Sequence, residues 1–129
     1  MNKIIIEISV GELLDKISIL EIKQVKIKDP EKIKFINNEY SILKSQFEKN
    51  VKSDDKLNQL YKSLKEINSK LWIIEDDKRQ CEKDKDFSDK FIKLSRDVHF
   101  LNDDRAKIKL EINNHSGSII KEIKEYTNY

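Results

Sequence analysis

The residues best able to do chemistry are polar side chains that interrupt the apolar faces of predicted helices. Successive residues lie 100° apart around a helix, so each apolar face can be checked for polar members. The candidates for a binding site or buried polar network are Glu21, Asn68, Glu75, Arg79, Asn102, Arg105, Lys109 and Asn113. The last four lie three or four positions apart and therefore form one line along a helix.

Arginine is used sparingly, and its positions suggest a specific role. Only Arg79, Arg96 and Arg105 occur among 26 basic residues, and Arg79 and Arg105 fall on predicted apolar faces. The planar guanidinium can grip a carboxylate or a ligand anion at two points, whereas the hydrated ammonium of lysine suits a solvent face. Arg105 therefore needs an anionic partner, and Glu21 is the internal partner that we expect.

Two interpretations of these polar residues remain open. In the first, they fix the register and antiparallel pairing of the helices at some cost in stability, as polar residues in helical seams commonly do. In the second, Asn102, Arg105, Lys109 and Asn113 line a pocket that accepts an anion. Breaking a buried ion pair would cost about 3 to 5 kcal/mol under either interpretation.

Neither a metal site nor a catalytic residue is predicted. His99 and His115 have no cysteine or second histidine at ligand spacing, and Cys81 extends an apolar face as a core thiol would. The acidic runs 75–77 and 103–104 could be imagined as a magnesium cluster. Because neighbours on a helix point about 100° apart, one or two residues of each run at most could face a shared ion. We expect no cofactor.

The composition favours a thin helical protein. Charged residues make up 39% of the chain and hydrophobic residues 37%, which suits long helices packed along narrow seams. The 26 basic and 24 acidic residues nearly cancel, and no basic block is segregated, so nucleic acid is not an expected partner. The short apolar run at residues 4–8 cannot span a membrane. The lone Cys81 fits a reducing compartment, so we expect a cytoplasmic protein.

Few residues can break a helix, and they place the elements. Ser9 and Glu12 match a capping box, which starts a helix that runs to about residue 28. Pro30 opens the second helix. After a polar connection at residues 50–54, heptad-spaced leucines predict a third helix, which ends at a charged turn near residues 84–86. The fourth helix ends at Ser116-Gly117, and a short last helix is predicted from residue 119 to about 126.

Residues 3–8 alternate in a way that predicts a short extended segment, with Ile4, Ile6 and Ile8 on one side. One strand alone is not stable, so the same segment of a second copy is the expected neighbour. The predicted fold class is all-α. We expect one domain over residues 1–129, an elongated antiparallel bundle of four long helices and a short C-terminal helix, preceded by the extended segment.

Three stretches resemble a bacterial domain-of-unknown-function family of short helical proteins. They are the opening ISVGELLDKISILEIK, the middle LWIIED followed by FIKL, and the later NDDRAKIKLEIN followed by GS. The resemblance implies an association with genes for surface-polysaccharide glycosyltransferases and helical-repeat proteins, and it assigns no catalytic residue. Its motifs contain Glu12, Asp15, Lys16, Glu21, Glu75, Asp76, Asn102, Asp103, Arg105, Lys109 and Asn113.

The leading functional hypothesis is a non-enzymatic interaction or scaffold module that binds another protein, a second copy included. The resemblance links it to bacterial surface-polysaccharide biosynthesis. The alternative is a bundle that binds a small anion, a nucleotide or a nucleotide-sugar, with metal-dependent hydrolysis as its furthest extension. Neither membrane insertion nor nucleic-acid binding is expected.

Overall fold

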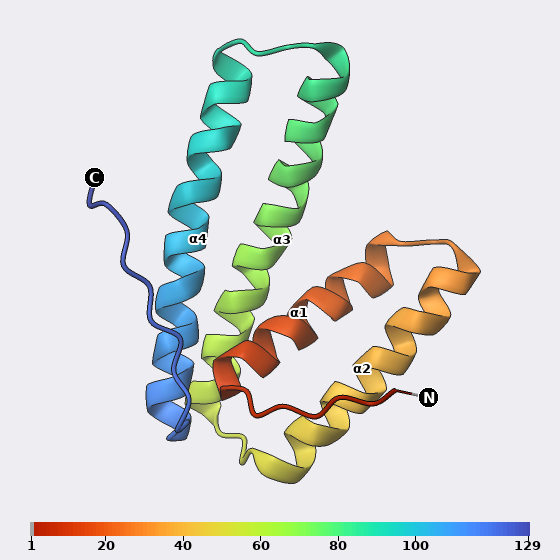
Figure 1. The fold of residues 1–129 in the computed structure, drawn as a ribbon, viewed down its shortest axis with the longest axis vertical. Coiled ribbons are helices and arrows are strands. Elements are labelled where there is room, and N and C mark those ends of the chain that lie inside the picture. Colours follow the sequence, from red (N-terminus) through yellow and green to blue (C-terminus); the bar gives the residue numbers. More distant parts are fainter. Residues whose placement is uncertain (1) are drawn as a thin grey trace.

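The structure, a computed structural model, describes residues 2–129 and confirms an all-α bundle. Its helices are α1 (Val10–Lys26), α2 (Pro30–Asn50), α3 (Asp55–Asp84) and α4 (Asp89–Ser116). They form two hairpins, α1–α2 and α3–α4, and the shorter hairpin packs against the lower part of the longer one (Figure 1).

The predicted start and stop signals set the helix ends. Ser9 Oγ accepts a hydrogen bond from the Glu12 amide at 3.0 Å, and Asp54 Oδ1 accepts one from the Leu57 amide at 2.8 Å. Pro30 stands at the start of α2, and Gly117, with φ of 69°, ends α4 in the left-handed conformation. Only half of the capping box forms as predicted, because the carboxylate of Glu12 binds Lys109 of α4.

Helix α1 lies at the centre of the arrangement and contacts each of the other three helices. Its predicted apolar face is buried, as at Leu14 and Ile17. A second row on the same helix is buried as well, formed by Gly11, Asp15, Ser18 and Ile22. The spacing of four, three and four places these residues on one side of the helix. Packing on several sides therefore buries polar residues that a single amphipathic face would leave in water.

The core lies where α1 crosses the base of the α3–α4 hairpin. Its buried members are Leu13, Leu14, Ile17, Leu57, Leu60, Leu64 and Ile112. Helix α2 covers one side with the partly buried Tyr40, Leu43 and Phe47, while Ile36 is its one buried residue. The leucine periodicity of α3 therefore marks residues that are buried, from Leu57 to Leu71.

The far half of the α3–α4 hairpin extends beyond α1 and α2 (Figure 1). The α4 residues Phe91, Leu94 and Val98 are only partly buried there because no third helix covers the seam, although Cys81 of α3 is buried. At the tip, Lys85 adopts the left-handed conformation with φ of 56° and closes the predicted charged turn. Exposed apolar residues at this end include Phe87 and Ile92, which are 52% and 51% exposed.

The predicted helix over residues 119–126 is wrong. From residue 118 onward the chain forms no regular element and runs back along α4 (Figure 1). The segment is attached by Glu122, which binds Lys109, and by Tyr129, which donates to Asp103 and packs edge-on against Phe100 at 5.5 Å between ring centroids. A helix of eight residues is marginal in water, so these contacts with α4 decide the path.

The N-terminal segment, residues 2–9, has no strand partner within residues 2–129. Ile8 packs against the core, whereas Ile4, Ile5 and Ile6 are 86%, 82% and 72% exposed. Over residues 2–129, no helix combines the length and apolar character needed to cross a bilayer.

Candidate functional site

A buried ion pair between α1 and α4 forms the centre of the polar cluster. Arg105 Nε donates to Asp15 Oδ1 at 2.9 Å, and Nη2 donates to Oδ2, so the guanidinium holds the carboxylate at two points. The Asp15 side chain is 2% exposed and that of Arg105 is 29% exposed. The acid that Arg105 binds is therefore Asp15, and the expected pairing with Glu21 is wrong.

Lys109 extends this pair by one turn of α4. Its Nζ donates to Glu12 at 2.8 Å and to Glu122 of the C-terminal segment at 2.9 Å, and it lies 3.8 Å from Asp15. Its side chain is 10% exposed. Two cations thus face three carboxylates that come from α1 and from the C-terminal segment.

Two asparagines complete the cluster. Asn68 of α3 donates from Nδ2 to Asp15 Oδ1 and to Ser18 Oγ, both at 2.8 Å. Asn113 of α4 accepts from the amide of Gly11 at 2.7 Å and so satisfies a free amide at the start of α1. The ion cluster, defined as Glu12, Asp15, Ser18, Asn68, Arg105, Lys109, Asn113 and Glu122, therefore ties α1 to α3, to α4 and to the C-terminal segment.

Electrostatics within the cluster favour the charged forms. Burial raises the pKa of Asp15, but hydrogen bonds from Arg105 and Asn68 and the charges of Arg105 and Lys109 outweigh it, so the pKa lies below its usual value. Burial lowers the pKa of Lys109, and its bonds to Glu12 and Glu122 more than compensate, so that pKa is raised. Both groups remain ionised at neutral pH.

The ion cluster is closed on itself. Within residues 2–129, no buried side-chain nitrogen or oxygen lacks a hydrogen-bond partner. One depression, of about 480 Å³, lies at the base of the molecule between the connection at residues 50–54 and the end of α4, and neither Arg105 nor Lys109 lines it. The cations of the cluster thus already have anions, and the depression lies elsewhere.

Glu21 forms a separate cluster between α1, α2 and α3. It accepts hydrogen bonds from the hydroxyls of Tyr40, at 3.0 Å, and Tyr61, and it lies 3.4 Å from Lys65 Nζ. Burial raises the pKa of Glu21, but the two tyrosine hydroxyls and Lys65 together lower it by more than burial raises it. The pKa of Glu21 therefore lies below its usual value. Glu21 therefore joins the hairpins through tyrosines rather than through Arg105.

Removing one tyrosine hydroxyl tests this second cluster. Tyr61→Phe is expected to lower the free energy of unfolding by about 1 to 2 kcal/mol, because a hydrogen bond to an ionised carboxylate is lost. Urea unfolding measures the change. Tyr126→Phe, at a tyrosine that is 72% exposed, is the matched control and should change stability little. Equal effects of the two substitutions would show that the Tyr61 hydroxyl contributes nothing.

Besides Glu21, three further predicted residues lie outside the ion cluster. Glu75 and Arg79 form an exposed pair on α3, 3.5 Å apart, with side chains that are 42% and 76% exposed. The helical spacing predicts an apolar face at these positions, but this part of α3 extends beyond α1 (Figure 1). Asn102 is partly buried on α4 and makes none of the hydrogen bonds of the cluster.

Sequence reasoning missed the two residues at the centre of the site. Asp15 is predicted only as a member of the family motif, and Gly11 is not among the predicted site residues. The available signal was the row of Gly11, Asp15, Ser18 and Ile22, whose spacing of four, three and four marks a second buried side of α1. Because this row contains glycine, aspartate and serine, a search for apolar periodicity does not detect it.

Among residues 2–129, no three histidine, cysteine, aspartate or glutamate side chains gather as ligands of a metal ion would. No match was found among curated proteins or among solved structures. A family model described as a family of unknown function (DUF6165) matches residues 4–129. The chain therefore belongs to the DUF6165 family of unknown function.

Proposed function

We propose that the protein is a non-enzymatic interaction or scaffold module that binds another protein with the free end of its α3–α4 hairpin. The observation that carries this proposal is the far half of that hairpin, which extends beyond α1 and α2 (Figure 1). Apart from Cys81, the apolar seam in this half is only partly buried, so a partner that covers it would remove further apolar surface from water.

The side chains at the hairpin end support a protein partner. Phe87 and Ile92 are each about half exposed, and Phe87 packs edge-on against Phe91 with 5.5 Å between ring centroids. Aromatic side chains, phenylalanine included, are enriched in protein–protein interfaces. We call Phe87, Phe91 and Ile92 the tip patch.

The closed ion cluster argues against the alternative of an anion-binding or nucleotide-binding bundle. An incoming anion would have to displace Asp15 from Arg105, or Glu12 and Glu122 from Lys109, and then meet the displaced carboxylates. The cost of leaving those charges unpaired would consume most of the binding energy. The cluster instead holds α1 rigidly against the base of the long hairpin.

The cellular setting is part of the same proposal. Cys81 is 2% exposed and free, which suits a reducing compartment such as the cytoplasm. Following the family resemblance, we place the partner among bacterial proteins of surface-polysaccharide biosynthesis. A scaffold function fits a protein whose polar residues satisfy one another.

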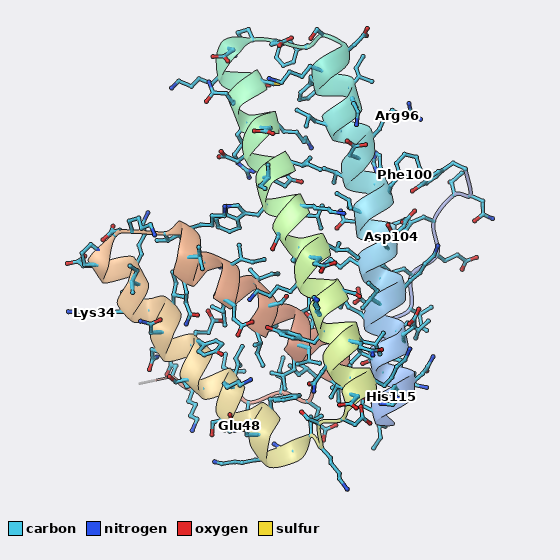
Figure 2. All side chains as sticks on the ribbon, turned by 180° about the vertical axis from the view of Figure 1, so that it is seen from behind. Lys34, Glu48, Arg96, Phe100, Asp104 and His115 are labelled. Atoms are coloured by element: carbon cyan, nitrogen blue, oxygen red, sulfur yellow. The ribbon has the colours of Figure 1, made fainter. Side chains whose placement is uncertain are left out.

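Site-specific photo-crosslinking tests the proposed surface. A photoreactive amino acid at Ile92 is expected to capture one protein in the cells of origin, and the same protein from position 87. The matched control is position 34 on α2, where Lys34 points away from the long hairpin (Figure 2) and should give no such adduct. Identical adducts from position 34 and from the tip patch would contradict the proposal.

A thermal-shift screen separates the proposal from the anion-binding alternative. Nucleotides, nucleotide-sugars and divalent ions should leave the melting temperature unchanged, because a ligand raises it only by binding the folded state. A rise with any of these compounds that is lost in Arg105→Met would overturn the scaffold proposal in favour of the alternative.

A further inference from the structure

Residues 2–8 form an arm that leaves three neighbouring isoleucines in water. Ile4, Ile5 and Ile6 are 86%, 82% and 72% exposed, and no backbone ladder holds the segment within residues 2–129. The root of the arm is nevertheless fixed, because Ile8 packs against the core and Ser9 caps α1. An unpaired extended segment rich in isoleucine offers its backbone groups for pairing with another strand.

We propose that the arms of two copies pair as antiparallel strands centred on Ile5, so that a second copy of this chain is the partner. In this register the numbers of two residues that lie opposite each other add up to ten. Lys3 then faces Glu7 of the second copy, Glu7 faces its Lys3, and Ile5 faces its own counterpart. One two-fold axis generates both charge pairs, as a symmetric dimer requires.

The same register sorts the side chains into two faces. Neighbouring side chains alternate across a strand, so Ile4 and Ile6 of both copies share one face, while Lys3 and Glu7 share the other with the central Ile5 pair. The resulting ribbon has one apolar and one mainly charged face. Helix α2 offers apolar surface for the isoleucine face, since Phe35 and Ile42 lie seven positions apart and are 78% and 54% exposed.

Other pairings of the arm lack this complementarity. A parallel ribbon in register would set Lys3 against Lys3 and Glu7 against Glu7, and like charges directly opposite each other destabilise a sheet. In the antiparallel register where opposite residue numbers add up to twelve, Glu7 lies opposite Ile5 and has no charged partner. The centre at Ile5 is therefore the arrangement in which every charge in the arm has an opposite partner.

Charge reversal tests the register in the whole protein. Light scattering after size-exclusion chromatography at tens of micromolar should give twice the chain mass of 15.3 kDa for the unaltered protein. Lys3→Glu and Glu7→Lys should each raise the dimer dissociation constant about tenfold, because each places like charges opposite one another twice. An equimolar mixture of the two variants should form a heterodimer, because opposite charges then face each other again. The chain that carries both changes should form a homodimer for the same reason.

A monomer of the unaltered protein at this concentration would overturn the proposal, and so would charge variants that dimerise as well as the unaltered protein. The charge variants should keep the thermal unfolding midpoint of the unaltered protein, because the arm lies outside the core. An unchanged midpoint excludes misfolding as the cause of weaker dimerisation. This dimer does not depend on the tip patch, so substitutions at residues 87 and 92 should leave it intact.

A cysteine placed on the two-fold axis gives an independent readout. In a Cys81→Ala background, Ile5→Cys is expected to form an intermolecular disulfide under mild oxidation, because opposite residues in an antiparallel pair lie close together. Ile119→Cys, at an isoleucine that is 99% exposed, is the matched control and should crosslink at least ten times more slowly. Equal rates at the two positions would overturn the pairing.

Discussion

Asp15→Asn is expected to lower the free energy of unfolding by about 3 kcal/mol, the lower end of the range for breaking a buried ion pair. An asparagine has nearly the same shape, but its amide would face the Nη2 of Arg105 with a donor where the carboxylate accepts. The guanidinium, which is 29% exposed, keeps some access to water, and this sets the cost at the lower end. Urea unfolding with a constant slope measures the difference.

The matched control for this substitution is Asp104→Asn, on the exposed side of α4, the helix that carries Arg105 (Figure 2). It removes the same charge from the chain and should change stability by no more than about 0.5 kcal/mol, as surface substitutions usually do. Equal losses from the two substitutions would mean that Asp15 acts only through the net charge of the protein.

The pH dependence of stability should identify the same residue. Because the pKa of Asp15 is lower in the folded protein than in the unfolded chain, its contribution is fully present above the unfolded value of about 3.9 and is lost as the pH falls through the folded value. The unaltered protein should therefore lose stability steeply below about pH 4. Asp15→Asn should show a shallower acid limb, and an unchanged limb would contradict the shift.

Gly11→Ala is expected to lower the free energy of unfolding by about 2 to 3 kcal/mol, through overpacking against α4. A Cβ at this position would meet the carbonyl oxygen of Lys109 at 2.6 Å and Oδ1 of Asn113 at 2.9 Å. The backbone oxygen cannot rotate away, so α1 must move and weaken the 2.7 Å bond between the Gly11 amide and Asn113. In an ordinary helix the same change would add stability.

Gly117→Ala is the comparison that separates crowding from backbone strain. At this position no atom lies within 4 Å of an added Cβ, and the cost comes only from the left-handed φ of 69°. We expect a loss of about 1 kcal/mol, which Gly117→Asn should reduce because asparagine tolerates that conformation. A neutral Gly11→Ala would show that α1 and α4 are not in close contact.

The four helices could be predicted because their end signals are local. Ser9, Pro30 and Gly117 each act on their own backbone, and the leucines of α3 repeat often enough to define a face. The C-terminal segment could not be predicted in the same way. Its path depends on contacts with α4. Lys109 binds Glu122, and Phe100 packs against Tyr129.

The candidate site was predicted in part for a related reason. Arg105, Lys109, Asn68 and Asn113 were found because they interrupt faces that are otherwise apolar, and the structure brings these four together. Their acidic partner was assigned wrongly, since the choice between Asp15 and Glu21 depends on which side of α1 faces α4. One helix packed against three neighbours has several buried sides, and sequence periodicity identifies only the most apolar of them.

The central claim is that the buried charges of α1 and α4 bind one another rather than a ligand, and a double-mutant cycle of Asp15→Asn with Arg105→Met measures it directly. Either single change leaves the remaining group without its partner. We therefore expect the double variant to lose less free energy of unfolding than the two single losses add up to, by at least about 2 kcal/mol. Losses that simply add would contradict a direct pair and reopen Arg105 to an external anion.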